Sequence, residues 1–327
     1  MGRATLAFAM GVTTLAAAAS GAAGADQGFE ISAGPLIMTR EQASAPILSR
    51  FTSSPTAGDI FDARNFNFSW NGGVEGRIGY RFQGPFGLET GGFWLAPWHQ
   101  TVINNTFSGE AQLPTTVPTL YGVPSGTVLN LSYQSRLFGA DAAATYTPGM
   151  MPAVTLLGGV AGYSLQETLD FKGVFAGGSF LETDTWQSRN LLIGPEIGAR
   201  ADLLRLCGTT DTPWEVVTGL KVALLWNGID NKFNDNITSL NQRATGSNSG
   251  STFAEGLQGG ISVGYHFAPN VAVTVGYQAL YLNGVALAPD QVRATSNFNV
   301  PGPNTLGRRT SDVLFHGLTA ALKVSFN

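Results

Sequence analysis

Cysteine, histidine and charged residues are scarce in this sequence of 327 residues. Its single cysteine, Cys207, excludes an internal disulfide framework and a metal cluster built on several cysteines, so we interpret it as an incidental thiol in a turn. Charged residues make up 12% of the chain, form no run of one sign, and give a formal net charge of -4. A nucleic-acid binder usually carries a basic excess, so the charge argues against that class.

Long apolar runs are also absent, except at the N-terminus. Arg3 is followed by an Ala- and Leu-rich run to Ala19, and then by small residues that end in Ala23-Gly24-Ala25. This pattern predicts a secretory signal peptide over residues 1–25 and a mature chain of 26–327, with a membrane-anchoring helix as the alternative. No later stretch approaches the roughly 20 apolar residues of a membrane helix, so we expect an exported chain without a helical span.

The sequence is rich in strict alternation between apolar and polar residues. Successive side chains of a strand point to opposite faces, so alternation gives the strand one apolar and one polar face. Between 74 and 82 the apolar residues are Val74, Ile78, Tyr80 and Phe82, and the charged residues are Glu75, Arg77 and Arg81. Gln83-Gly84-Pro85 then predicts a short hairpin turn. A soluble β-sandwich would alternate in the same way.

About ten such strands follow one another along the chain. Their approximate ranges are 29–37, 74–82, 86–94, 129–146, 153–166, 190–203, 214–224, 257–267, 271–278 and 318–326. The ranges 129–146 and 153–166 alternate less cleanly, a pattern typical of β-bulges. The strands are about as long as the roughly 9 to 11 residues of a tilted membrane strand.

The connections between these strands alternate between short and long. Short turns follow Phe82, Tyr146, Leu204 and Phe267, whereas long polar loops are expected over 39–65, 96–127, 167–185, 227–252 and 284–310. Outer-membrane barrels have short periplasmic turns and long extracellular loops. We therefore predict an all-β fold, a transmembrane antiparallel up-and-down β-barrel of about ten strands, as the single domain of residues 26–327.

A barrel assigns a role to each face of its strands. Aromatic residues expected at the membrane interface, next to the short turns, are Tyr80, Phe82, Phe86, Tyr146, Trp214, Tyr265, Phe267 and Phe326. Charged residues expected to line the lumen are Glu75, Arg77, Arg81, Glu89, Glu196, Arg200, Asp202, Glu215, Lys221 and Lys323. These charges could instead form a plug of ion pairs that conducts nothing. Inward glycines at 73, 79, 194 and 198 would reduce the side-chain volume inside the lumen and so favour an open path.

Catalytic and metal-binding patterns give no signal. His99, His266 and His316 are the only histidines, and none belongs to a nucleophile elbow or a metal-spaced pair, so we expect no enzyme, no cofactor and no metal. Asp230, Asn234 and Asp235 lack the spacing of a calcium loop and are interpreted as solvated loop residues.

Several short segments carry a family resemblance: 271–285, followed by 289–292 and Asn297, together with 79–82, 87–89, 189–198 and 315–318. They resemble a family of bacterial outer-membrane β-barrel porins. The resemblance covers most of the mature chain through short, dispersed motifs. It implies a β-barrel in the outer membrane of a bacterial cell.

We expect this barrel to form a narrow passive pore for small hydrophilic solutes. The alternative is a non-conducting barrel that acts as a structural anchor or binds a surface partner through its long loops. Expected partners are outer-membrane lipid, the barrel-assembly machinery and small hydrophilic solutes, with no nucleic acid.

Overall fold

The computed structural model describes residues 27–41, 49–51, 59–61, 66–112, 121–174, 180–209, 212–237, 242–296 and 305–326. The predicted signal peptide lies outside the described residues.

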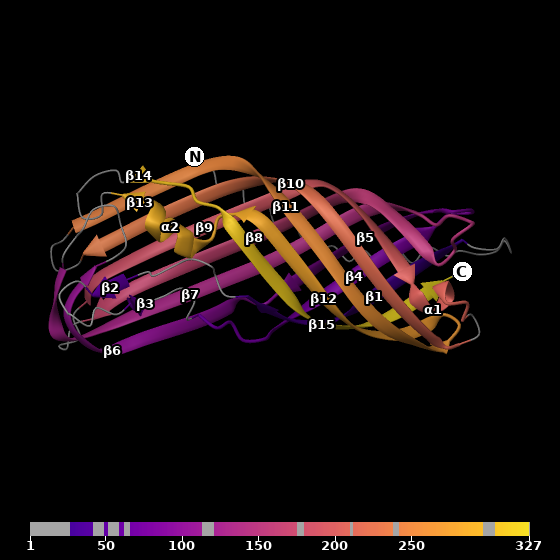
Figure 1. Cartoon of the computed structure of the whole chain (residues 1–327), viewed down its shortest axis with the longest axis horizontal. Helices are drawn as coiled ribbons and strands as arrows, with labels where there is room; N and C mark the ends of the chain where they lie inside the picture. The colour runs from indigo at the N-terminus through magenta and orange to yellow at the C-terminus, as the bar shows by residue number, and fades with distance from the viewer. Residues whose placement is uncertain are drawn as a thin grey trace.

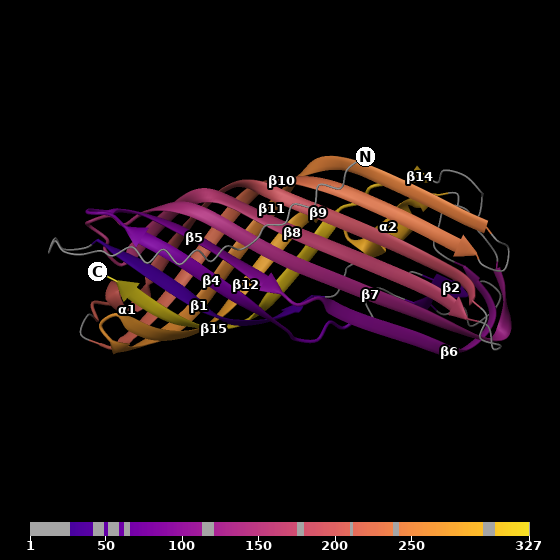
Figure 2. The same cartoon turned by 180° about the vertical axis from the view of Figure 1, so that it is seen from behind.

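Ten antiparallel strands close into a ring (Figures 1 and 2). In ring order they are β1 (Gly28–Arg40), β4 (Asn71–Arg81), β5 (Phe86–Leu95), β7 (Tyr121–Tyr146), β8 (Val154–Val174), β9 (Phe180–Asp202), β10 (Trp214–Ile237), β11 (Gln242–Ala268), β12 (Val271–Val285) and β15 (Ser311–Phe326). The first and last strands pair from Phe29 with Phe326 to Arg40 with Phe315, which closes the barrel. The predicted up-and-down barrel is therefore confirmed.

The two ends of the barrel differ. At the end that we call the turn end, short connections join β4 to β5, β7 to β8, β9 to β10 and β11 to β12. Gly84 takes a positive φ of 97° in the first of these turns, a conformation that glycine adopts without steric cost. A short helix, α1 (Leu203–Leu206), precedes β10 and lies beside the C-terminus (Figure 1).

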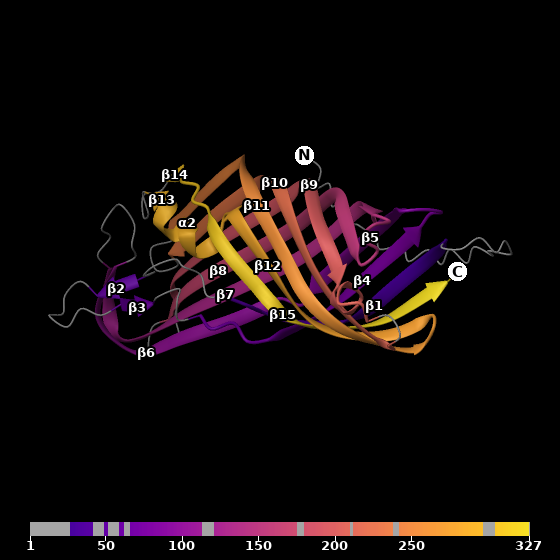
Figure 3. The same ribbon diagram turned by 45° about the vertical axis from the view of Figure 1, so that its right-hand side comes forward.

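At the opposite end, which we call the loop end, the wall is uneven. Strands β7 to β11 continue well beyond the ends of β12, β15, β1 and β4, and β6 (Trp98–Gln112) extends the line of β5 along β7 (Figure 3). The loops predicted over 96–127, 167–185 and 227–252 are therefore wrong as loops, because most of their described residues are strand. Most of their outward side chains are polar, Ile103 being an exception, and this polarity gives them the composition of a loop.

The remaining long connections hold small elements at the loop end. Between β12 and β15 the chain forms α2 (Ala288–Ala294) and the short pair β13 (Thr295–Ser296) and β14 (Thr305–Leu306). Between β1 and β4 it forms β2 (Ser49–Phe51) and β3 (Asp59–Phe61), and β2 pairs with the end of β6. In the described part of the chain, neither helix is long and apolar enough to cross a membrane.

The predicted irregular strands are regular. β7 and β8 pair without a register shift from Val128 to Tyr146, so the bulges expected there are absent from the described pairing. Alternation weakens in this region because the inward side is also apolar, with buried residues such as Leu137 and Leu165. Register shifts occur instead between Asn104 and Gly109 in the β6–β7 pair.

The outer face of the ring carries an apolar band. On β10, Leu224 is 64% exposed and points outward, whereas its neighbour Leu225 is fully buried inside. Outward Val222 and Trp226 continue this band along the strand. An exposed apolar belt around a closed ring is the surface that a bilayer covers, and closure leaves no unpaired strand edge within it.

Candidate functional site

The lumen of the turn-end half holds a network of charged side chains. Glu89 on β5 accepts hydrogen bonds from Arg77 on β4, at 2.5 Å, and from Arg200 on β9, at 3.1 Å. β9 is separated from β5 by two strands of the ring, so this carboxylate links distant parts of the wall. Its side chain is only 5% exposed, which makes its two arginine partners necessary.

A second part of the network is centred on Lys221 of β10. Its ammonium group lies 2.7 Å from Asp141 on β7 and 3.3 Å from Glu196 on β9. Arg77 reaches the same Asp141 at 3.6 Å, which joins the two parts. Asp141 was missed by the sequence analysis, because it lies within the apolar, alanine-rich range 129–146, where no charged face was recognised.

A chamber of about 190 Å³ lies beside this network. Its lining includes Glu75, Arg77, Asp141, Gln258 and Gln278. Glu75 accepts a hydrogen bond from the Gln278 amide at 2.8 Å and another from the Thr319 hydroxyl. The chamber is therefore polar and carries charge of both signs.

Other predicted lumen residues lie nearer the turn end. Lys323 bridges Glu30 at 3.1 Å and Glu215 at 3.8 Å, and His266 lies 3.3 Å from Glu215. Asp202 instead caps α1, because its carboxylate accepts hydrogen bonds from the backbone N–H groups of Leu204 and Arg205.

Arg81, the last residue of β4, is exposed and forms no ion pair among the described residues. The structure thus brings most of the predicted charges together and leaves Asp202 and Arg81 at the periphery of the network.

The inward glycines have a different role from the expected one. A Cβ atom at Gly194 would overlap the carbonyl oxygen of Leu224, and one at Gly73 would overlap that of Trp94. At Gly198 it would come within 2.6 Å of the Leu220 carbonyl, whereas at Gly79 there is room. Three of the four positions therefore require glycine because a neighbouring strand approaches closely, rather than because the lumen must stay open.

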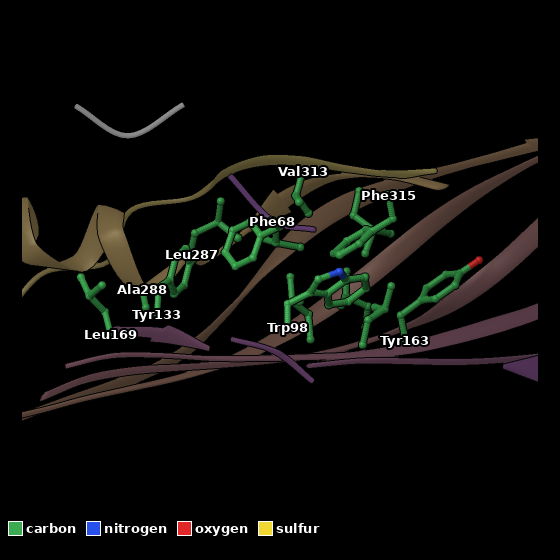
Figure 4. Close-up of a cluster of buried hydrophobic side chains, with 14 of the residues drawn as sticks. Phe68, Trp98, Tyr133, Tyr163, Leu169, Leu287, Ala288, Val313 and Phe315 are labelled. Carbon is green, nitrogen blue, oxygen red and sulfur yellow. The ribbon is translucent and has the colours of Figure 1, made fainter. Parts of the chain in front are cut away.

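An apolar layer of buried side chains lies inside the barrel beyond the chamber, toward the loop end (Figure 4). Trp98 and Phe315 face each other across the interior, with ring centroids 5.5 Å apart. Nearly every strand of the ring contributes, and members no more than 2% exposed include Leu36, Leu95, Trp98, Leu137, Leu165, Leu192, Leu225, Leu282 and Phe315. The sequence analysis missed this layer, since it treated inward apolar residues as lapses in the alternation.

A buried ion pair follows at the loop-end side of the layer. Arg40, at the end of β1, lies 2.8 Å from Glu167 of β8, and both side chains are fully buried. Tyr133 donates to Glu167 at 2.6 Å and accepts from Arg40 at 2.9 Å, and the backbone N–H of Ala288 in α2 donates to Glu167 at 2.9 Å. This carboxylate therefore connects the wall to the segment that fills the loop end.

Burial also affects the titration of this group of residues, which lies beyond the apolar band. Burial raises the pKa of the Tyr133 phenol well above its ordinary value. Burial lowers the pKa of Arg40, but the charge of Glu167 and the hydrogen bond to Tyr133 outweigh it, so the pKa of Arg40 is raised. Arg40 therefore stays charged at any physiological pH.

Two asparagines anchor the same segment. Asn190 on β9 donates to the carbonyl of Ala286 at 2.8 Å and accepts from its N–H at 2.7 Å. Asn227 on β10 donates to the carbonyl of Gly284 at 2.9 Å. The chain that leaves β12 is thus held inside the barrel by wall side chains, next to the apolar layer.

The predicted interface aromatics lie at the turn end. Ring contacts join Tyr80 to Phe82 at 5.0 Å, Phe86 to Tyr146 at 5.1 Å, Trp214 to Tyr265 at 4.8 Å and Tyr265 to Phe267 at 5.4 Å between centroids. Phe326 is 53% exposed at the end of the last strand.

The histidines and the candidate calcium residues do not converge. His99 contacts Thr101, and His316 contacts the Tyr277 hydroxyl at 2.5 Å. Asp230, Asn234 and Asp235 lie on strand β10 rather than in a loop, and Asp235 points to the opposite face from the other two. No group of three metal-binding side chains occurs in the part of the chain that the structure describes.

Comparison with known proteins identifies the family. A family model described as "Putative beta barrel porin-7 (BBP7)" matches residues 117–326, which is more than half of the chain. The chain belongs to the BBP7 family. No curated protein matches it in sequence.

Among solved structures, an outer-membrane barrel shares the fold of this BBP7 protein. The outer membrane protease OmpT from Escherichia coli matches with a TM-score of 0.50 and 12% identity, over 92% of this chain and 97% of that chain. The translocator domain of the autotransporter NalP from Neisseria meningitidis gives a TM-score of 0.37 and 10% identity, over 93% and 89% of the two chains. The family and the fold place the protein in the bacterial outer membrane.

Proposed function

We propose that this BBP7 protein is a non-conducting outer-membrane barrel in the described conformation, and that it acts as an anchor for the tall wall and loops at its loop end. The apolar layer across the lumen carries this proposal. Its side chains come from strands around the ring and, with Leu287, Ala288 and Val292 of the segment after β12, form one buried cluster among the described residues. Apolar constrictions exclude water, and hydrated ions do not pass a dry segment.

The energetics of the layer agree with a permanent seal. Burying one large apolar side chain contributes about 1.5 to 3 kcal/mol, and the layer contains several such residues. A ring of ten strands is only slightly wider than the eight-stranded barrels whose interiors side chains fill completely. Opening a path would require many of these side chains to leave their packing positions together.

The proposed orientation places the loop end outside the cell. Short periplasmic turns and long external segments are the usual arrangement of bacterial outer-membrane barrels, and the polar wall beyond the apolar band suits contact with water. In this orientation the wall and its loops are available to a surface partner. Export by the predicted signal peptide and insertion by the barrel-assembly machinery are parts of the same proposal.

The proposal includes no enzymatic activity. OmpT is a protease by its description, but a likeness at 12% identity supports the fold alone. Each described histidine has a different neighbour, and none forms a base and nucleophile pair with serine or cysteine among the described residues.

A pore for small hydrophilic solutes is the second candidate. The polar chamber favours it, because Arg77 and Arg200 keep 30% and 39% of their side-chain surfaces exposed. Water therefore reaches the turn-end half of the lumen. Transport would then require the segment between β12 and β15 to move and the apolar layer to part.

Planar-bilayer conductance of the refolded mature protein separates the two candidates. Three proteins are compared: the unaltered chain, a variant with residues 288–308 replaced by a short Gly-Ser linker, and the double variant Trp98→Ser with Phe315→Ser. Heat-modifiable migration in a gel confirms that each has folded. For a barrel sealed by its wall, we expect conductance only from the double variant, because loop replacement removes Ala288, Val292 and Leu306 from the buried cluster but leaves the side chains that the wall contributes.

Steady channels from the unaltered protein would overturn the proposal. Channels from the linker variant alone would favour the second candidate, a pore closed by its loop segment.

A further inference from the structure

The outward face of β7, β8 and β9 changes from apolar to polar between two adjacent rows of the sheet. Register pairing defines both rows. From β7 to β9, the first row is Phe138, Ser164 and Leu191. The second row, one step toward the loop end, is Arg136, Gln166 and Arg189. On the turn-end side of the first row, outward Val160 and Ile193 continue the apolar band. The two arginines therefore occupy the first polar row beyond the membrane interior, at the depth of the lipid headgroups.

Both arginines are available for a ligand. Arg136 and Arg189 are exposed, and neither forms an ion pair among the described residues. The nearest carboxylate in register, Asp230 on β10, lies opposite Arg189 but pairs with Lys232 at 3.4 Å. Adjacent strands are about 4.8 Å apart, so the two arginine Cα atoms are separated by roughly 10 Å, across one strand. Both guanidinium groups can therefore reach one anion placed over Gln166.

We propose that Arg136 and Arg189 bind the phosphate of a phosphorylated glycolipid in the outer leaflet of the membrane. Guanidinium groups bind phosphate through paired N–H donors, and basic residues at the headgroup depth attract anionic lipid. The Gln166 amide between them donates one N–H to Ser164 at 3.4 Å and supplies its second N–H as a further donor. Leu191, which is 66% exposed one row below, contacts the acyl chains of the same molecule.

The opposite sector of the barrel carries the opposite charge. Glu255 on β11 and Asp312 on β15 point outward there, and Asn283 donates to Glu255 at 3.4 Å. Carboxylates repel phosphate, so phosphate binding is disfavoured beside Glu255 and Asp312 and favoured at the arginine pair. The site is therefore local, rather than a general belt of interfacial charge. This inference rests on the proposed orientation, with the loop end outside.

The test measures lipid A bound to the folded, detergent-solubilised barrel after washing, by native mass spectrometry. Diphosphorylated lipid A is the probe, and lipid A without phosphates is the comparison. The test variant is Arg136→Gln with Arg189→Gln. The control is Lys172→Gln with Arg243→Gln, which removes the same charge from two exposed outward positions. Lys172 lies six residues farther along β8 than Gln166, and Arg243 lies on β11. Heat-modifiable migration verifies folding of both variants.

We expect the arginine variant to retain at least five-fold less diphosphorylated lipid A than the unaltered protein, with the control unchanged. Both variants should retain phosphate-free lipid A equally, because this probe contacts only the apolar rows. An equal loss in the control would overturn the proposal in favour of general charge attraction. Equal retention of diphosphorylated lipid A by the arginine variant and the unaltered protein, with loss of inorganic-phosphate binding in the variant alone, would overturn it in favour of a free anion. Neither result depends on conductance, so failure of the lipid-binding proposal would not count against the non-conducting proposal.

Discussion

Single ion pairs in the lumen differ in how much water they meet, and this difference determines what each contributes to stability. Glu89 is nearly buried between Arg77 and Arg200, whereas Glu30 keeps 47% of its side chain exposed beside Lys323. A buried carboxylate holds neighbouring cations that would otherwise be poorly solvated, while an exposed pair exchanges its contacts with water at little cost.

Replacement of Glu89 by Gln should therefore destabilise the barrel. We expect a loss of about 1 to 3 kcal/mol, below the 3 to 5 of a fully buried pair because both arginines are partly exposed. Glu30→Gln is the matched control and should change stability by less than about 0.5 kcal/mol. Urea midpoints of folded protein, read from heat-modifiable gels, measure both. Equal losses in the two variants would contradict the assignment of Glu89 as the centre of the network.

Strand β10 offers a test of the lipid-facing surface. Val222 points outward within the apolar band, and Asn234 points outward on the same strand beyond it. An arginine at the bilayer midplane costs about 2 to 4 kcal/mol, so Val222→Arg should lower the free energy of unfolding in vesicles by that amount. Asn234→Arg, which stays in water, should change it little. Equal effects would show that the band does not face lipid.

The sequence could predict the phase of this strand, but not the contacts of the apolar layer. Val222 and Leu224 alternate with Lys221, and alternation alone identifies the outward side. Leu225 continues the inward side with an apolar residue, and its burial depends on side chains from other strands, such as Leu192 and Leu282. Such long-range packing leaves no local pattern in a single sequence.

At the scale of elements, the length of the strands was the main feature that the sequence did not reveal, because the residues beyond the apolar band are as polar as a loop. β10 and β11 pair from Trp214 with Tyr265 to Ile237 with Gln242, far beyond the apolar band. Their inward residues near the loop end include Phe233, which packs against Trp186 of β9 with ring centroids 5.1 Å apart. Backbone pairing and this inward packing stabilise a polar segment that resembles a loop in composition.

The segment around α2 is held to this tall wall by Glu167, and its attachment can be tested. Glu167→Ala removes the carboxylate that forms the buried ion pair with Arg40, and also removes the acceptor of the Ala288 N–H. Leaving a buried charge unpaired costs about 3 to 5 kcal/mol, so the segment should detach before the barrel unfolds. We expect residues 286–294 to lose amide-exchange protection by at least ten-fold, while β9 and β10 at the turn end keep theirs.

Gln166→Ala is the control for this experiment, because Gln166 precedes Glu167 on β8 but points outward. It should leave amide exchange in 286–294 unchanged. Protection that survives Glu167→Ala would mean that Asn190 and Asn227 are sufficient to hold the segment.

At the scale of the whole molecule, the even number of strands places the start of the first strand and the end of the last strand at the same end of the barrel. Phe29 at the start of β1 pairs with Phe326 at the end of β15, at the turn end beside α1 (Figure 1). The predicted short turns are at this end, so connection lengths along the sequence were sufficient to distinguish the two ends of the barrel. They were not sufficient to describe the loop end, where strands replace the expected loops.

Orientation in the membrane follows from the same asymmetry and can be measured on intact cells. A protease-sensitive tag is inserted between Ile237 and Gln242, at the tip of the β10–β11 hairpin, and in a second protein at Gly149, in the β7–β8 turn. A Cβ atom at Gly149 meets no atom within 4 Å, so an insertion there should disturb little.

With the loop end outside, protease added to cells should cut the hairpin tag completely and spare the turn tag, because the outer membrane excludes the protease from the periplasm. Permeabilising the outer membrane should then make the turn tag equally sensitive, which controls for its accessibility. Cleavage of the turn tag in intact cells, with survival of the hairpin tag, would reverse the orientation and place the arginine pair in the inner leaflet.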